Sequence, residues 1–375
     1  MKKILIFYAS FGGGHLSAAR NIKEYIDLHY DSEVETHLVD SMEYINKALN
    51  IVSKRAYIEM AKNAHWAWKQ LYNKTEKGTL SKFTATANKL MSIKLNKLLQ
   101  ELNPYLIIAT DPFSSQMCSI IKKNGKVDCK LATVLTDYAA HPLWLINHEQ
   151  VNYFFVAHEG IKSLLLEYGV DESKIFVTGI PLSNRFLLSY DKEKILSEFG
   201  LEVDKATILF FAGGEYGFGK DKTYNMLKSL ISHFPHMQVI AIAGRNAKMK
   251  ERFENLVSET SSEKTVRILE YTNKVPELMS VSDLVISKPG GLTTTESIAS
   301  GLPIVVINPI PGQEEANARF VEEKDIGIWI KKQDNVEEKL RSILNSPERI
   351  KSMKINARLN AKRNSTKDIC EILLN

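Results

Sequence analysis

Three glycine-rich turns provide the clearest chemistry in this sequence, because each could bring backbone amides close to a phosphate. Gly12-Gly13-Gly14-His15 directly follows the apolar run 3–9, Gly213-Gly214-Glu215-Tyr216-Gly217 follows the apolar run 207–211, and the third turn occupies 287–296. Glycine permits a tight turn, and the amides at a helix start favour an anion. The first turn is neither the dinucleotide pattern Gly-x-Gly-x-x-Gly nor a Walker loop, so we do not expect a nicotinamide or P-loop site.

The third turn, Ser287-Lys288-Pro289-Gly290-Gly291-Leu292-Thr293-Thr294-Thr295-Glu296, carries the strongest signal. A buried strand is expected to end at Ser287, and a helix to run from Leu292 to Ser300. The amides of Gly291 to Thr294, with the threonine hydroxyls, would suit a diphosphate. Glu296 lies one turn inside the helix, where a carboxylate can accept two ribose hydroxyls.

A polar cluster follows the next predicted strand, in Pro309-Ile310-Pro311-Gly312-Gln313-Glu314-Glu315-Ala316-Asn317. Amide and carboxylate side chains at the start of a helix suit recognition of sugar hydroxyls. For Glu314 and Glu315 the alternative is a favourable position for acids near the positive end of a helix.

Strand-length apolar runs alternate with amphipathic stretches of helix length, which indicates an α/β fold with parallel sheets. We expect two doubly wound domains, joined near the polar stretch 188–204, with one or two helices over 347–374. The predicted strands form two series: 3–9, 34–39, 105–110, 131–136, 152–156 and 175–178, then 207–211, 239–242, 266–269, 284–286, 304–307 and 326–330. Ligands in such sheets bind outside the carboxyl ends of the strands, where the turns above fall.

Composition favours a globular cytoplasmic protein. The 375 residues include 44% hydrophobic and 25% charged residues. The three cysteines, Cys118, Cys129 and Cys370, are too few and too widely spaced for a disulfide framework or a metal cluster. The apolar start of the chain is too short for a signal peptide and is predicted to be a buried strand. No stretch approaches the length needed to cross a bilayer, so any membrane contact is expected to be peripheral.

Positive charge is concentrated between Lys47 and Lys97, where eleven Lys or Arg stand against two acids. Aromatic residues are interleaved with this charge, including Trp66, Trp68 and Tyr72 beside Lys69. Basic residues next to aromatics suit an anionic membrane surface. The alternatives are a solvated helical face with its aromatics in the core and, least favoured, nucleic acid.

Together these motifs resemble those of the diacylglycerol glycosyltransferases, a family that includes bacterial processive diacylglycerol glucosyltransferases and plastid monogalactosyldiacylglycerol synthases. The resemblance rests on Gly12–His15, on Lys288-Pro289-Gly290-Gly291-Leu292-Thr293-x-x-Glu296 and on Pro311-Gly312-Gln313-Glu314-x-x-Asn317. Thr136-Asp137-x-x-x-His141-Pro142-x-Trp144 and Gly179-Ile180-Pro181 also stand where the family has them, so nearly the whole chain is covered. The transferase that adds GlcNAc to make lipid II is a more distant relative.

The resemblance implies a GT-B fold, in which two Rossmann-like domains face a cleft. It implies an acceptor and membrane domain over 1–187, a UDP-sugar domain over 188–350 and a final helix, 351–375, that returns to the first domain. It also implies inverting transfer of a hexose, with glucose favoured, from UDP-glucose or UDP-galactose to diacylglycerol at the cytoplasmic face of an anionic membrane. No cofactor or metal is expected, and the sequence has no Asp-x-Asp pair.

Roles carried over from the family fall on two sets of residues. The UDP-sugar set would bind diphosphate, ribose, uracil and sugar, the uracil meeting 271–275; it consists of Gly14, Gly213, Gly214, Gly217, Arg245, Thr272, Val275, Gly290, Gly291, Leu292, Thr293, Thr294, Glu296, Gln313 and Glu314. The acceptor or membrane set consists of Trp66, Trp68, Lys69, Tyr72, His141 and Trp144.

The catalytic base is expected to be His15 or Asp137. A neutral imidazole has a useful pKa near neutrality, and Asp137 could orient it or act as the base itself. Ser183 stands where relatives often carry an arginine near the nucleotide, and Arg185 could substitute for it.

Three other functions remain open. The acceptor could be another lipid, such as a polyprenyl-diphosphate sugar, with UDP-GlcNAc or UDP-galactose as donor. A UDP-sugar epimerase could share the paired architecture, although it would not need the basic aromatic segment. A UDP-sugar-binding module without catalysis is the least favoured.

Overall fold

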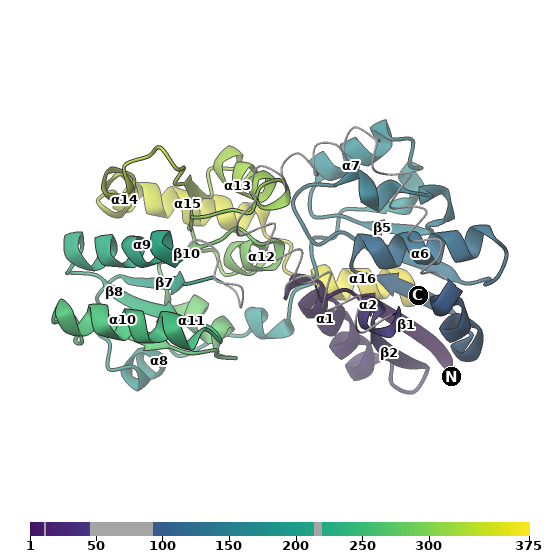
Figure 1. Cartoon of the computed structure of the whole chain (residues 1–375), viewed down its shortest axis with the longest axis horizontal. Coiled ribbons are helices and arrows are strands. Elements are labelled where there is room, and N and C mark those ends of the chain that lie inside the picture. Colours follow the sequence, from purple (N-terminus) through teal and green to yellow (C-terminus); the bar gives the residue numbers. More distant parts are fainter. Residues whose placement is uncertain (11–12, 46–92, 214–219) are drawn as a thin grey trace. The chain divides into compact units, whose positions relative to one another are not determined.

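All the strands that the apolar runs predict are present, and they build two six-stranded parallel sheets (Figure 1). The computed structural model describes residues 1–10, 13–45, 93–213 and 220–375. Contacts within the chain divide it into two units: Met1–Ser183, Pro311–Gln313 and Lys362–Asn375 form one, and Asn184–Ile310 with Glu314–Ala361 form the other.

The first sheet has the strand order β2-β1-β3-β4-β5-β6. Its strands are β1 (Lys2–Tyr8), β2 (Val34–Asp40), β3 (Leu106–Ala109), β4 (Lys130–Val134), β5 (Tyr153–Phe155) and β6 (Ile175–Phe176). All four residues of β3 are buried, as expected for a strand covered by helices on both faces.

Helices of the first unit follow its strands in turn. They are α1 (Gly14–His29), α2 (Ser41–Ile45), a helix over 93–102, α6 (Pro112–Lys123) and α7 (Glu159–Glu167), with 3-10 turns η1 (Pro142–Leu145), η2 (His148–Gln150) and η3 (Glu172–Lys174). The last helix of the chain, α16 (Ser365–Leu374), packs against α1 (Figure 1). Ile369 and Leu373 of α16 join Ile22 and Ile26 of α1 in one buried cluster.

The second sheet has the strand order β12-β11-β10-β7-β8-β9. Its strands are β7 (Thr207–Phe211), β8 (Gln238–Ile242), β9 (Val266–Leu269), β10 (Leu284–Ser287), β11 (Ile304–Val306) and β12 (Gly327–Trp329). The backbone of β12 approaches β11 so closely that a Cβ built on Gly327 would lie 1.9 Å from the carbonyl oxygen of Ile304, so only glycine fits there.

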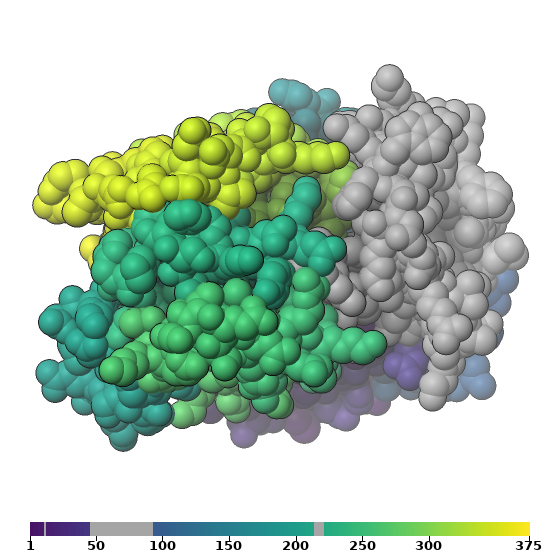
Figure 2. All heavy atoms as spheres, turned by 60° about the vertical axis from the view of Figure 1, so that its left-hand side comes forward, coloured from purple at the N-terminus to yellow at the C-terminus, as the bar shows by residue number. Residues whose placement is uncertain are grey.

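Helices of the second unit are η4 (Asn184–Leu187), α8 (Lys192–Glu198), α9 (Lys220–His233), α10 (Ala247–Glu259), α11 (Val275–Val281), α12 (Gly291–Ala299), α13 (Gln313–Glu323), α14 (Val336–Leu344) and α15 (Pro347–Asn360). Figure 2 shows part of this layer from outside; α14 packs against α9, and α15 packs against α14 and α12. The predicted 347–374 stretch is thus two helices, and the second of them is largely buried on one face because it packs on α1.

Candidate active site

In each sheet, successive strands are first added on one side of the initial strand and then on its other side, so the strand order reverses at one pair of neighbouring strands. The reversal lies between β1 and β3 in the first sheet and between β7 and β10 in the second. The connections on either side of such a pair leave in opposite directions, which opens a crevice at the carboxyl ends of the strands. His15 and Asp111 follow β1 and β3, while Gly213 and the 288–291 turn follow β7 and β10.

His15 lies in the first turn of α1, and its ring is fixed by the neighbouring strand ends. Nδ1 lies 2.6 Å from the carbonyl oxygen of Thr110 and 3.0 Å from the hydroxyl of Thr136. A carbonyl can only accept, so Nδ1 carries the proton and Nε2 of the neutral ring carries the lone pair. The hydroxyl of Thr110 lies 3.0 Å from the carbonyl oxygens of both Phe7 and His15, which share its single proton, so it ties the start of α1 to the ends of β1 and β3.

Asp111 is a buried carboxylate near His15 that the sequence analysis did not select. It is the N-cap of α6: Oδ1 accepts from the amides of Phe113 and Ser114, and the Ser114 hydroxyl donates to Oδ2. Burial raises the pKa of Asp111, and the nearby charge of His15 opposes that rise. The detectable signal was Thr110-Asp111-Pro112 after a buried strand, a helix-start pattern that also places a charge at the sheet edge.

Asp137 follows β4 and is adjacent in sequence to Thr136, which contacts His15. The structure therefore brings both predicted base candidates to the same edge of the first sheet. Of the predicted acceptor residues, His141 caps η1 by accepting from the amide of Leu143, and Trp144 is only 1% exposed. Trp144 is thus part of the packed interior and not of an exposed surface.

The predicted diphosphate turn forms the start of α12, with Gly290 as N-cap. The amide of Thr294 donates to the carbonyl of Gly290, so the amides outside the helix's own bonding are those of Gly291, Leu292 and Thr293. The Thr295 hydroxyl donates to the carbonyl of Gly291, and Thr294 is 1% exposed, whereas Thr293 is partly exposed. The predicted anion contacts of this turn are therefore the three backbone amides, with Thr293 as the one of these three threonines that is not buried.

Glu296 lies on α12 one turn after these amides. Burial raises the pKa of its carboxyl to about 8. Among the residues that the structure describes, no hydrogen bond or ion pair to this carboxylate is recorded. Glu296 is partly exposed, so a ligand can reach its carboxyl. Each hydrogen bond donated by a ligand hydroxyl would favour the charged form of this carboxyl and lower its pKa.

Glu314 lies in the first turn of α13 and is already engaged. Its carboxylate is 3.0 Å from the Lys288 ammonium and accepts from the amide of Ile310 at 2.6 Å. Gln313 begins the same helix. The Glu314 side chain therefore joins the two turns that follow the neighbouring strands β10 and β11.

The remaining described residues that were predicted to bind the donor lie at the carboxyl ends of β7, β8 and β9. Gly213 has φ +99°, a conformation that favours glycine. The guanidinium of Arg245 stacks 4.8 Å from the ring centre of Tyr271. Thr272 accepts from the amide of Lys274, and Val275 begins α11.

Arg185, the possible substitute for the arginine of relatives, makes two hydrogen bonds to Glu277 of α11, at 2.9 and 3.0 Å.

Some predicted site residues lie outside the described ranges. They are Gly214 and Gly217 of the second glycine-rich turn, and Trp66, Trp68, Lys69 and Tyr72 of the basic aromatic segment. Their roles stay predictions.

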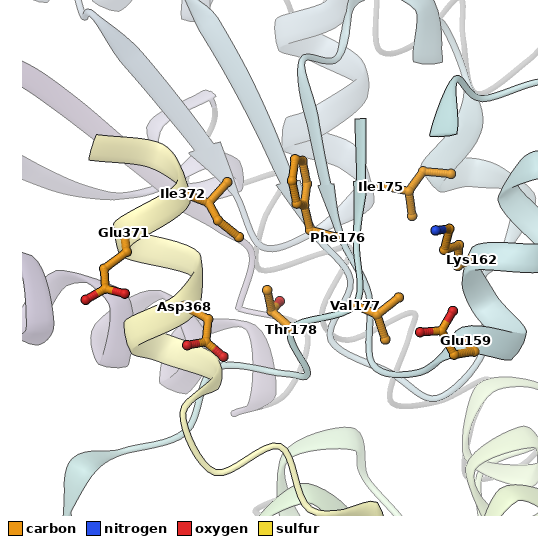
Figure 3. A pocket seen from close by; sticks show the side chains of 9 residues that line it. All are labelled: Glu159, Lys162, Ile175, Phe176, Val177, Thr178, Asp368, Glu371 and Ile372. Carbon is orange, nitrogen blue, oxygen red and sulfur yellow. The ribbon is translucent and has the colours of Figure 1, made fainter. Parts of the chain in front are cut away.

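A pocket of about 500 Å³ lies in the first unit beside β6, α7 and α16 (Figure 3). Its charged lining residues are Glu159 and Lys162 of α7 and, on the other side of the pocket, Asp368 and Glu371 of α16, with Thr178 between the two helices. None of its lining residues belongs to the predicted site. Within the described residues, no group of three or more His, Cys, Asp or Glu could hold a metal ion, and no helix is long and apolar enough to cross a membrane.

Comparisons with known proteins agree with the two-sheet α/β fold. Residues 15–182 match the monogalactosyldiacylglycerol (MGDG) synthase family, and residues 209–371 match the glycosyltransferase family 28 C-terminal domain. Among solved structures, a UDP complex of Staphylococcus aureus MnaA aligns with TM-score 0.67 at 14% identity, covering 100% of this chain and 96% of that one. Acinetobacter baumannii MurG aligns with TM-score 0.62 at 13% identity, covering 99% of each chain.

The fold and the matched domains define a glycosyltransferase of the GT-B fold, as the sequence predicts. A processive diacylglycerol beta-glucosyltransferase of Bacillus pumilus is 30% identical over 372 residues, which cover 99% of this chain and 94% of that protein. The chain belongs to the family of the processive diacylglycerol beta-glucosyltransferases.

Proposed function

We propose that this protein transfers glucose from UDP-glucose to diacylglycerol, with inversion at the anomeric carbon. The observation that carries the proposal is the full-length similarity to a processive diacylglycerol beta-glucosyltransferase, 30% identical over 99% of the chain. The described residues that we assign to this reaction lie at the carboxyl ends of strands, near the point in each sheet where the strand order reverses.

The donor would bind at the second sheet. The amides of Gly291, Leu292 and Thr293, together with the positive end of α12, would hold the diphosphate. Glu296 would accept two ribose hydroxyls, and the loop that contains Thr272 and Val275 would meet the uracil through its backbone. Gly213, Gly214, Gly217 and Arg245 would border the phosphates, and Gln313 would read the sugar hydroxyls.

The acceptor would react at His15, close to Gly14. The lone pair on Nε2 takes the proton of the diacylglycerol hydroxyl as the hydroxyl oxygen forms its bond to the anomeric carbon. The bond from that carbon to the β-phosphate oxygen breaks at the same time, and its electron pair leaves with UDP. The buried charge of Asp111 stabilises the imidazolium that forms, and Asp137 is the second candidate for this supporting role or for the base.

Membrane contact would come from the basic aromatic segment Lys47–Lys97, which suits anionic lipid. This part of the proposal has its own test. Alanine substitution of Trp66, Trp68, Lys69 and Tyr72 should weaken co-sedimentation with anionic liposomes and leave UDP affinity unchanged. Unchanged liposome binding would remove this segment from the acceptor surface.

The experiment for the whole proposal offers UDP-glucose and UDP-galactose separately to the purified protein with diacylglycerol in anionic liposomes. Glycolipid is measured by mass spectrometry, and UDP release is measured in parallel. We expect monohexosyl and longer glycolipids from UDP-glucose, with one UDP released for each hexose transferred.

Other results would redirect the proposal. UDP release without glycolipid would indicate donor hydrolysis or another acceptor. Turnover only with UDP-GlcNAc and a different lipid would support the alternative transferase, and interconversion of UDP-sugars without lipid would support an epimerase.

A further inference from the structure

We infer that Glu314 and Lys288 are a positioning pair that fixes the diphosphate turn, and that Glu314 is not a reader of the sugar. The inference rests on the proposed donor site and departs from the role that the family resemblance gives to Glu314.

The Glu314 carboxylate already has hydrogen-bond partners within the protein. Oε1 and Oε2 lie 3.0 and 3.3 Å from the Lys288 ammonium, and Oε2 also accepts from the amide of Ile310 at 2.6 Å. Both side chains are mostly buried, at 17% and 15% exposure. A carboxylate that satisfies a buried lysine and a backbone amide is costly to redirect, because its partners would lose their hydrogen bonds.

A second contact from the same helix supports the inference. Asn317 lies one turn after Glu314 on α13, is fully buried and donates to the carbonyl of Pro289 at 2.8 Å. Side chains three residues apart on a helix share a face. One face of α13 therefore holds both Lys288 and Pro289, the two residues that lead into Gly290 and Gly291.

The consequence concerns the amides of Gly291, Leu292 and Thr293. Their directions depend on the path of the chain through Lys288 and Pro289, so the pair sets the geometry of the anion site without touching the anion. Loss of the pair would then weaken binding of UDP itself, even though UDP lacks the transferred hexose that a sugar-reading Glu314 would contact.

The test measures affinity for UDP and for UDP-glucose by calorimetry in Glu314→Gln, Lys288→Met and the double variant. Each single substitution should lower the affinity for both ligands by the same factor, about tenfold. The affinity of the double variant should be no lower than that of the weaker-binding single variant, because the two residues share one interaction. Lys288→Arg, which keeps the charge, should recover most of the affinity.

Glu322 and Lys331 offer a matched control. Glu322 is also on α13, accepts from the amide of Trp329 and lies 3.3 Å from the Lys331 ammonium. Glu322→Gln and Lys331→Met should leave both affinities within about twofold of the unsubstituted protein, as expected for a partly exposed ion pair away from the ligand.

Three results would overturn the inference. Weaker binding of UDP-glucose with unchanged binding of UDP in Glu314→Gln would make Glu314 a sugar reader. Tighter binding of UDP in Glu314→Gln, or additive losses in the double variant, would make Lys288 a direct phosphate ligand. Absence of UDP binding in the unsubstituted protein would instead contradict the proposed donor site.

Discussion

The polar groups at the edge of the first sheet are held by other side chains and by strand carbonyls, whereas those at the edge of the second are mainly backbone amides. His15 is fixed by Thr110 and Thr136, with the buried Asp111 nearby. The α12 turn offers the amides of Gly291 to Thr293, while Thr294 and Thr295 are buried. A single side-chain substitution can remove the chemistry of the first edge, whereas a substitution other than to proline leaves a backbone amide in place. The second edge therefore depends on the residues that set its shape.

The largest expected effect comes from His15→Gln. Loss of the base should reduce the transfer rate by roughly 10²–10⁴-fold, because that is the usual contribution of a general base. UDP affinity, measured by calorimetry, should stay within about twofold. A variant that retains full transfer activity would move the base to Asp137.

Glu296→Gln tests the carboxylate that is proposed to accept the ribose hydroxyls. At pH 7 a carboxyl with a pKa of about 8 is mostly protonated, and ribose hydroxyls favour its charged form, so nucleotide binding should release a proton. Affinity for UDP should therefore rise with pH up to about 8 and then level off. At pH 9 the variant should bind about 10–100-fold more weakly, the value of about one charge-assisted hydrogen bond, because the amide oxygen of glutamine can still accept from one ribose hydroxyl.

The measurement for Glu296 is calorimetry in buffers of different ionisation enthalpy, from pH 6 to 9. The variant provides the correction for titration of the phosphate itself. An identical proton release in both proteins would exclude Glu296 from the nucleotide site.

Asp111→Asn should have an intermediate effect on catalysis. Asparagine is also a good N-cap, so α6 should keep its start and the melting temperature should change little. Removal of the charge disfavours the imidazolium, so the acid limb of the rate profile should move to lower pH and the maximal rate should fall about tenfold.

The pH dependence of the transfer rate separates this electrostatic role of Asp111 from a structural one. Asp191→Asn, which alters the exposed cap of α8, is the matched control and should leave the profile in place. A lower rate with an unshifted acid limb would show that Asp111 only supports the fold.

The smallest expected effect comes from Thr294→Val. The hydroxyl of Thr294 is buried and has no hydrogen-bond partner in the part of the chain that the structure describes. Its removal at constant shape should raise stability by about 1 kcal/mol, the cost of an unsatisfied buried polar group. Thermal unfolding with and without UDP checks this, and a large loss of UDP affinity would restore the hydroxyl to the diphosphate site.

The sequence by itself determined the two sheets, because each central strand is a continuous apolar run between glycine or proline turns. It also determined that 12–15 and 288–296 stand at strand ends, where neighbouring residues alone set the turn and the helix start. These features are local, so periodicity and turn chemistry are sufficient to predict them.

Only the tertiary structure decided which groups meet across the strands. Thr110 is 95 residues from His15 in the chain, and Glu314 is 26 residues from Lys288. Their contacts depend on strand order, which places β3 beside β1 and β11 beside β10. Burial likewise depends on packing from distant segments, so the raised pKa of Glu296, the enclosed Trp144 and the charge of Asp111 near His15 could not be derived from the neighbouring sequence.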